Sequence, residues 1–141
     1  MTAMRALNDI RHTLLHSTGV GEFFGHEGFP EFDQDLMNMI LDEAAKLSDD
    51  IFSPLNPVGD RVGSKLGENG VTTPEGFRAA YQAFSEGGWG ALPFPEEFGG
   101  QGLPRTLAIA VMEMIMSANL SLSLCPTLTV GAIEALMTYG D

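Results

Sequence analysis

The sequence predicts an all-α, bundle-like fold without a sheet, and three observations support this prediction. Apolar residues recur at spacings of three and four over several long segments, as they do on one face of a helix. Alternation of apolar and polar residues never lasts long enough to build a sheet. Typical N-cap residues precede the helical segments, and Pro or Gly follows them. Because no internal repeat is visible, we expect one set of packed helices.

The composition indicates a soluble, acidic protein. Its 141 residues suffice for one domain with its own core, and 44% of them are hydrophobic. The formal net charge is -12 and the basic residues are scattered singly, which argues against binding to nucleic acid or an anionic membrane. These basic residues are Arg5, Arg11, Lys46, Arg61, Lys65, Arg78 and Arg105.

Cysteine usage and the lack of targeting signals favour the cytoplasm. The single cysteine, Cys125, excludes an internal disulfide and fits a reducing compartment. The start of the chain, MTAMRALNDIRH, has no apolar core of signal-peptide length. No window is expected to reach the roughly 20 apolar residues that a membrane span needs. We therefore expect a cytoplasmic protein without a membrane span.

Two helices are predicted in the first third of the chain. The first covers Ala3–Leu15, and a glycine-rich loop follows it whose phenylalanines are expected to touch the core. The second covers Gln34–Phe52, with Asp33 as its N-cap and Asp35 in the first turn, where the helix dipole favours negative charge. Pro54 is expected to end this helix near Phe52.

The middle of the chain predicts a surface loop followed by a third helix. Asn56–Gly70 carries four glycines and mixed charge, which indicates turns on the surface. Thr73 suits an N-cap and Pro74 suits the first helical position, so we expect the third helix to begin there. Its buried face is expected to carry Phe77, Tyr81 and Phe84, and Gly87–Gly88 should end it.

The last third predicts two more helices after a segment rich in Pro and Gly. Trp89–Phe94 is expected to be extended and Pro95–Phe98 to form one helical turn. Leu103–Ser117 is the fourth predicted helix. Pro126 is expected to open or bend the last one, which reaches Tyr139 with four apolar side chains inside: Leu128, Ile133, Leu136 and Met137.

The C-terminal tract is depleted in charge. From Thr106 onward there is no Lys or Arg, and Glu113, Glu134 and Asp141 are its charged residues. Leu107–Met116 is apolar almost all round, so a helix there lacks a face suited to water. Either other helices of this chain cover both of its sides, or part of its cover lies outside the chain.

Several residues are of types that could carry chemistry, and each has a structural alternative. His12 and His16 lie at i and i+4 but have no evident third ligand, so we expect two surface histidines rather than a metal site. Glu113 and Glu134 in apolar helices suit acid–base work if buried, but pairing with an arginine or capping is the favoured interpretation. Cys125 has no nearby His, which favours a buried, inert thiol over a nucleophile.

Two other patterns have a binding and a structural interpretation. The glycines of EFGGQG lack the order, the preceding strand and the following Lys of a phosphate-binding loop. The methionines of the charge-depleted tract fit core packing, and alternatively the lining of an adaptable apolar cavity; they are Met112, Met114 and Met116.

The order of motifs resembles the N-terminal helical domain of acyl-CoA dehydrogenases. The chain carries GGWGALPFPEEFGGQGL, then an apolar helix with one Glu, then PTLTVGAIEALMTYGD. The family shows a Gly-Trp, then P-E-x-(Phe or Tyr)-G-G-x-G, then two packed helices that end in Gly-Asp or Gly-Ser. The upstream pieces LNDIRHTLLH, ILDEAAKLSDDIFSPLNPVGDRVG and TTPEGFRAAY resemble the bacterial branch that acts on methylthiopropionyl-CoA (3-methylmercaptopropionyl-CoA) and related acyl-CoA substrates. The resemblance covers nearly the whole chain. It divides the chain into an N-terminal helix and loop extension, 1–30, and the family domain, 31–141.

The resemblance implies part of an oxidoreductase of fatty acid metabolism. Family members are FAD-dependent flavoproteins that convert an acyl-CoA to the trans-2-enoyl-CoA and pass electrons, in most cases, to an electron-transferring flavoprotein. Their flavin and catalytic glutamate belong mainly to a middle β-domain and a C-terminal helical domain, so the chain is expected to be a fragment. We assign it no catalytic residue, cofactor or activity of its own. Its implied role is one wall of the acyl cavity, from Ser123, Pro126, Thr127 and Val130.

A second hypothesis comes from a different functional class. A self-standing helical interaction module with this fold and no chemistry would offer its apolar face to a protein partner. A reading frame that continues past Asp141 into a β-rich segment favours the enzyme, and a stop codon there favours the module.

Overall fold

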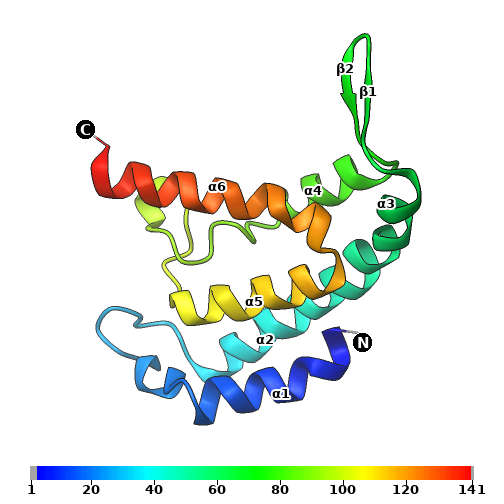
Figure 1. The fold of residues 1–141 in the computed structure, drawn as a ribbon. Helices are drawn as coiled ribbons and strands as arrows, with labels where there is room; N and C mark the ends of the chain where they lie inside the picture. The colour runs from blue at the N-terminus through cyan, green and yellow to red at the C-terminus, as the bar shows by residue number, and fades with distance from the viewer. Residues whose placement is uncertain (1–2, 141) are drawn as a thin grey trace.

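The computed structural model describes residues 3–140, apart from the side chains of residues 4 and 5, and most of this part is helical (Figure 1). The α-helices are α1 (Ala3–His16), α2 (Gln34–Lys46), α3 (Asn56–Val62), α4 (Phe77–Glu86), α5 (Arg105–Ala118) and α6 (Leu120–Tyr139). The all-α prediction is therefore confirmed. Asp141 and the side chain of Arg5, which the sequence analysis counted among the charged residues, lie outside the described part.

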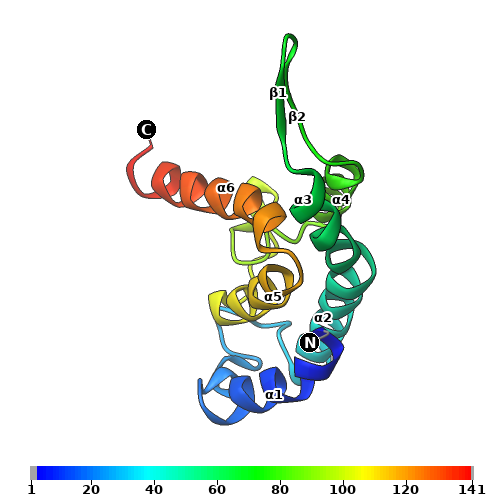
Figure 2. The same ribbon diagram turned by 45° about the vertical axis from the view of Figure 1, so that its right-hand side comes forward.

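The core lies where α5 packs on α1 and α2 (Figures 1 and 2). α2 packs on α1, and α5 contacts both of these helices and α6. Leu107, Val111 and Ile115 are fully buried on α5, and Met37 and Leu41 are fully buried on α2. α5 is thus largely covered by this chain, with Ile109 as its exposed apolar residue.

The first two predicted helices are confirmed. α1 buries Leu7, Ile10 and Leu14, and the side chain of Asp33 accepts a hydrogen bond of 2.7 Å from the backbone N–H of Leu36 at the start of α2. The loop phenylalanines pack against the core as expected: Phe23, Phe24 and Phe29.

Helical structure continues past the predicted stop at Pro54. α2 runs into a π-helical segment, Leu47–Phe52, then a 3₁₀ turn, Ser53–Leu55, and then α3. The prediction of a surface loop over Asn56–Gly70 is therefore wrong for its first half. Pro54 and Pro57 each lie in the first turn of a new helical segment, where the missing N–H has no helical partner to lose.

A small β-hairpin corrects the expectation that the chain has no sheet. β1 (Lys65–Gly67) and β2 (Gly70–Thr72) pair antiparallel, with Leu66 opposite Val71. The hairpin stands out from the helices and every residue in it is exposed (Figures 1 and 2). It was missed because strands of three residues are too short to show alternation.

α4 begins later along the chain than the sequence predicts. Thr73 and Pro74 are not helical, Glu75 and Gly76 form a turn, and the helix starts at Phe77 after Gly76, whose φ is +86°. A Cβ on Gly76 would lie 2.7 Å from the side chain of Leu55. The left-handed backbone of Gly76 interrupts a right-handed helix, so α4 starts after it and not at the local N-cap signal.

The segment between α4 and α5 is a chain of turns. The predicted single helical turn is confirmed as the 3₁₀ turn Glu96–Phe98, whereas the extended structure expected for Trp89–Phe94 is wrong. There, backbone hydrogen bonds from Ala91 to Gly88 and from Phe94 to Ala91 fold the chain back on itself. These turns place Trp89 and Pro93 beside α5.

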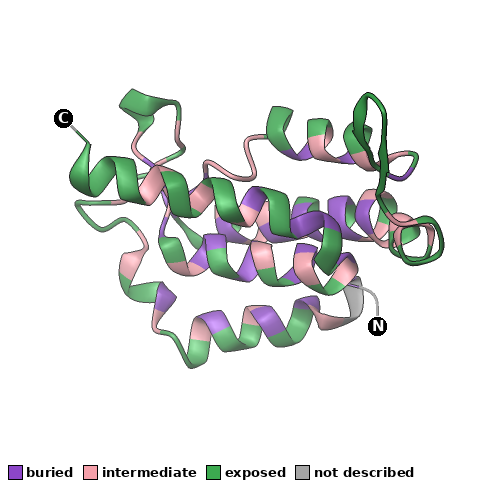
Figure 3. Ribbon diagram, turned by 45° about the horizontal axis from the view of Figure 1, so that its top comes forward, coloured by how far each residue is buried: buried purple, intermediate pink, exposed green. Residues whose placement is uncertain are grey.

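α6 is a single helix with Pro126 inside it, and most of its surface is exposed (Figure 3). The prediction that its apolar side chains lie inside is wrong for three of the four: Leu128 is 76%, Leu136 is 68% and Met137 is 47% exposed. Ile133 is half-buried. Length and composition alone would let this 20-residue helix cross a membrane, contrary to the expectation that no window is so apolar.

Asn119 joins α5 to α6 and ties this corner to the core. Its side chain is buried, caps α6 by accepting a hydrogen bond from the N–H of Leu122 at 3.1 Å, and donates one to the carbonyl of Phe52 at 3.3 Å. The polar side chain is therefore bonded on both sides, as a buried amide must be.

Replacing Asn119 with alanine should lower the free energy of unfolding by about 2 kcal/mol, because the cap is lost and the buried carbonyl of Phe52 loses its partner. Urea unfolding followed by circular dichroism measures this. Asn119→Ser, which keeps a cap oxygen, should recover part of the loss. Equal stability of the alanine variant and the native chain would contradict the assigned role.

Candidate functional site

An apolar groove of about 530 Å³ lies between α5 and α6, and we refer to it as the α5–α6 groove. The turns after α4 close it on a third side. Its apolar lining consists mainly of Trp89, Pro93, Ile109, Met112, Met116 and Val130.

Helical periodicity builds both walls of the groove. Ile109, Met112 and Met116 recur at intervals of three and four on α5, so they share one face of that helix. Thr127 and Val130 do the same on α6. Two of the three methionines thus line a cavity, as the alternative interpretation proposed, whereas Met114 is buried in the core.

The predicted acyl-cavity residues occupy two different environments. Thr127 and Val130 line the groove and are half-buried, whereas Ser123 and Pro126 are buried behind it. The Ser123 hydroxyl donates to the carbonyl of Leu120 at 2.8 Å, and the Thr127 hydroxyl donates to the carbonyl of Ser123 at 2.8 Å. Both hydroxyls are therefore bonded within α6, which leaves this wall with apolar character.

An ion pair connects the two walls at one end of the groove. Arg105 Nη1 on α5 lies 2.5 Å from Glu134 Oε1 on α6. The favoured interpretation of Glu134, pairing with an arginine, is confirmed. Glu113 is exposed at the groove, so neither glutamate has the deep burial that the acid–base interpretation requires.

Trp89 and Pro93 were missed as lining residues. They belong to no periodic element, and their place depends on the turns between α4 and α5. The only signal for them in the sequence is the density of Gly and Pro, which predicts turns but not the direction in which a turn faces.

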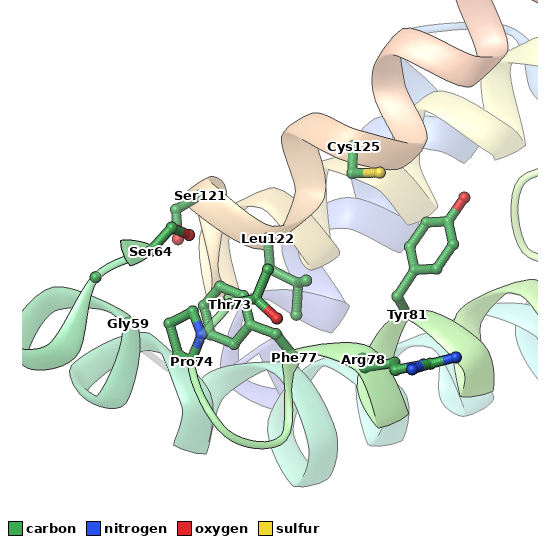
Figure 4. Close-up of a pocket in the computed structure, with 11 residues that line it drawn as sticks. Gly59, Ser64, Thr73, Pro74, Phe77, Arg78, Tyr81, Ser121, Leu122 and Cys125 are labelled. Atoms are coloured by element: carbon green, nitrogen blue, oxygen red, sulfur yellow. The ribbon is translucent and has the colours of Figure 1, made fainter. Parts of the chain in front are cut away.

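Cys125 is exposed, so the prediction of a buried thiol is wrong. It lies on α6 at a second cleft, of about 590 Å³, which also involves α3 and α4 (Figure 4). Figure 4 shows Cys125 and the ring of Tyr81 on facing sides of this cleft, with Phe77 near Leu122. The thiol faces away from the core because the buried side of this part of α6 carries Leu122, Ser123 and Pro126.

The exposed thiol should react with Ellman's reagent in the native chain at a rate close to that in the urea-unfolded chain. Absorbance at the thiolate product wavelength follows both reactions. A native rate lower by about a hundredfold, which marks a thiol reached only through transient opening, would contradict this placement.

The two histidines of α1 lie as their spacing predicts. The ring centroids of His12 and His16 are 4.6 Å apart and both residues are exposed. Among residues 3–140, no three His, Cys, Asp or Glu side chains are grouped as a metal site requires. That the chain binds no metal stays a prediction.

Comparison with known proteins identifies the fold that carries this groove. A sequence model described as "Acyl-CoA dehydrogenase, N-terminal domain" matches residues 57–141, more than half of the chain. The chain belongs to the acyl-CoA dehydrogenase family. The matched part begins at α3 and includes both walls of the groove, so the groove is a feature of the family domain.

Two curated relatives agree with the family match. The chain is 34% identical over 141 residues to the 3-methylmercaptopropionyl-CoA dehydrogenase of Ruegeria pomeroyi, and the match covers 100% of this chain and 24% of that protein. It is 29% identical over 108 residues to the broad-specificity linear acyl-CoA dehydrogenase FadE5 of Mycobacterium tuberculosis, covering 75% of this chain and 18% of that protein. The chain therefore spans about a quarter or less of each relative.

The resemblance read from the sequence motifs is thus confirmed at the level of the family. The boundary between an extension, 1–30, and the family domain stays a prediction. The structure shows that α1, from this extension, packs into the same core as α5 of the acyl-CoA dehydrogenase domain.

Proposed function

We propose that the chain acts as the N-terminal helical domain of an FAD-dependent acyl-CoA dehydrogenase, with the α5–α6 groove as one wall of the acyl cavity. The enzyme would convert an acyl-CoA thioester to its trans-2-enoyl-CoA. One observation supports this proposal most strongly. Thr127 and Val130 line an apolar groove within the family domain, and the family resemblance maps both residues to the acyl cavity.

The charges of the groove support an uncharged, apolar occupant. Arg105, the basic residue among the described lining, is paired with Glu134, and Glu113 adds negative charge at the groove. A free carboxylate would find no unpaired cation there, whereas an acyl thioester carries no charge on its chain. The role of these residues would be to hold the acyl chain and exclude water from it.

The groove does not suit FAD itself. The two phosphates of the cofactor require basic side chains or backbone N–H groups, and the one arginine of the described lining already has a carboxylate partner. We therefore derive no chemical step through the flavin at this chain. FAD, the catalytic base and the contact with an electron-transferring flavoprotein would belong to other parts of a cytoplasmic enzyme.

The exposed face of α6 supports contact with such other parts. Leu124, Leu128 and Tyr139 are 53%, 76% and 85% exposed, which is unusual for large apolar side chains gathered on one helix. In the second hypothesis, an interaction module without chemistry, the same face would bind a separate protein.

A hybrid enzyme tests the proposal. Residues 1–141 replace the aligned quarter of the Ruegeria pomeroyi relative, and the purified protein is assayed for bound flavin and for enoyl-CoA formation, with the unmodified relative as control. We expect a flavin-containing hybrid that dehydrogenates an acyl-CoA. A folded hybrid that binds flavin but forms no enoyl-CoA would contradict the proposed wall and favour the interaction module.

A further inference from the structure

The ion pair between Arg105 and Glu134 joins two helices that are otherwise connected at their opposite ends. α5 and α6 meet at Asn119, and Arg105 is the first residue of α5, as far from that junction as this helix reaches. The side chains of Arg105 and Glu134 are 60% and 38% exposed, and their charged atoms lie 2.5 Å apart. The groove is thus bounded by the helix junction at one end and by a charged bridge at the other.

The groove changes chemically along its length. Met116 and Thr127 lie toward the helix junction, Met112 and Val130 follow, and the ion pair comes last. Thr127 and Glu134 are seven positions apart on α6, about 10 Å along the helix axis. An apolar chain that lies along the groove with its end toward Arg105 would contact mainly apolar atoms over this distance, with Glu113 at the exposed edge, and would then meet the two groups of the ion pair.

Building on the proposed acyl-binding role of the groove, we propose that the Arg105–Glu134 ion pair is a polar end-stop that limits how far affinity rises with the length of a linear acyl chain. Each methylene buried before the stop improves binding about fourfold. A methylene that reaches the pair gains no such burial, because it would have to displace water from two charged groups without replacing their hydrogen bonds. Affinity should therefore rise with chain length and then level off.

The single tryptophan of the chain makes this measurable. Trp89 lines the same groove, so its fluorescence reports on an occupant without a label. The 141-residue chain is titrated with butanoyl-, octanoyl- and hexadecanoyl-CoA, and with CoA alone to correct for absorption by the adenine ring.

The test variant removes both charges, Arg105→Ala with Glu134→Ala, so that no unpaired charge remains. Its matched control, Glu43→Ala with Lys46→Ala, removes the other exposed 2.5 Å ion pair, which lies on α2 away from the groove. Exchanging the two charges, Arg105→Glu with Glu134→Arg, keeps a bridge and should behave like the native chain. Thermal melts confirm that each variant is folded, and Arg105→Met with Glu134→Met, which removes both charges and keeps long side chains, replaces the double alanine variant if that melts early.

We expect the native chain and the α2 control to bind hexadecanoyl-CoA no better than octanoyl-CoA. The variant without the bridge should bind hexadecanoyl-CoA at least about tenfold tighter than the native chain does, since additional methylenes become buried. An unchanged length profile in that variant would overturn the end-stop while leaving the acyl groove in place. No response of Trp89 to any acyl-CoA would overturn the proposed acyl-binding role together with the end-stop.

Discussion

Replacing Val130 with aspartate should lower kcat/KM of the hybrid enzyme for acyl-CoA by about a hundredfold or more. Val130 is half-buried in the apolar wall, between Met112 on the facing helix and Thr127 one turn earlier. A carboxylate there has no basic partner, because the nearby arginine is paired with Glu134. The loss corresponds to about 3 kcal/mol, which is in the range for an unpaired charge brought against an apolar chain.

Two controls separate this effect from damage to the fold. Val130→Ile keeps the apolar wall and should retain activity within about threefold, since similar apolar volumes are tolerated. Ala79→Asp adds the same charge to an exposed position of α4 and should leave kcat/KM unchanged. A Val130→Asp hybrid with near-native activity would show that the acyl chain does not contact this wall.

Replacing Gly100 with alanine should destabilise the 141-residue chain by about 3 kcal/mol, or roughly 10 °C in Tm. A Cβ built on Gly100 would lie 2.0 Å from the carbonyl oxygen and 2.3 Å from the carbonyl carbon of Phe94. Backbone atoms cannot rotate away as a side chain can. The loop would have to open, weakening the hydrogen bonds from Gly100 to Pro95 and from Gly102 to Phe94.

Gly131→Ala is the matched control for this substitution. Gly131 lies in α6, and no atom comes within 4 Å of a Cβ built there. Alanine favours the helix by up to about 1 kcal/mol, so this variant should melt at or above the native temperature. Differential scanning calorimetry compares the three proteins. A Gly100→Ala chain that melts within a degree or two of the native one would contradict the close approach to Phe94.

The helices that could be predicted are those whose local sequence features, such as an apolar tract or an N-cap residue, match the way the helix packs in the fold. α5 was predicted to within two residues because its long apolar tract is helical; the prediction began at Leu103, whereas the helix begins after Pro104, its N-cap. Asp33 was predicted as an N-cap because its carboxylate, one residue before α2, can reach the N–H groups of the first turn.

The errors arise where a distant contact decides the local structure. α4 starts after Gly76, whose left-handed backbone lies against Leu55, a residue of the 3₁₀ turn Ser53–Leu55 about twenty positions earlier in the chain. The side of α6 that packs inward is not visible in its sequence, because apolar residues surround that helix on all sides. The sequence therefore does not predict that Leu128 and Leu136 are exposed, since their residue type predicts burial.

Some residues of the candidate site could be predicted from the sequence, and others could not. Thr127 and Val130 came from the family resemblance, and the adaptable methionine wall came from the cluster in α5. Trp89 and Pro93 required the turns after α4, and the pairing of Glu134 with Arg105 required the antiparallel arrangement of α5 and α6.

Photolabelling tests the central claim, that the α5–α6 groove binds the acyl chain, most directly. An acyl-CoA with a diazirine at the end of its chain is irradiated with the hybrid enzyme, and the labelled peptides are sequenced by mass spectrometry. We expect the label on the lining residues of α5 and α6, chiefly Met112, Thr127 and Val130. Label confined to the α3–α4 cleft around Phe77 and Tyr81, or to residues outside this chain, would contradict the claim.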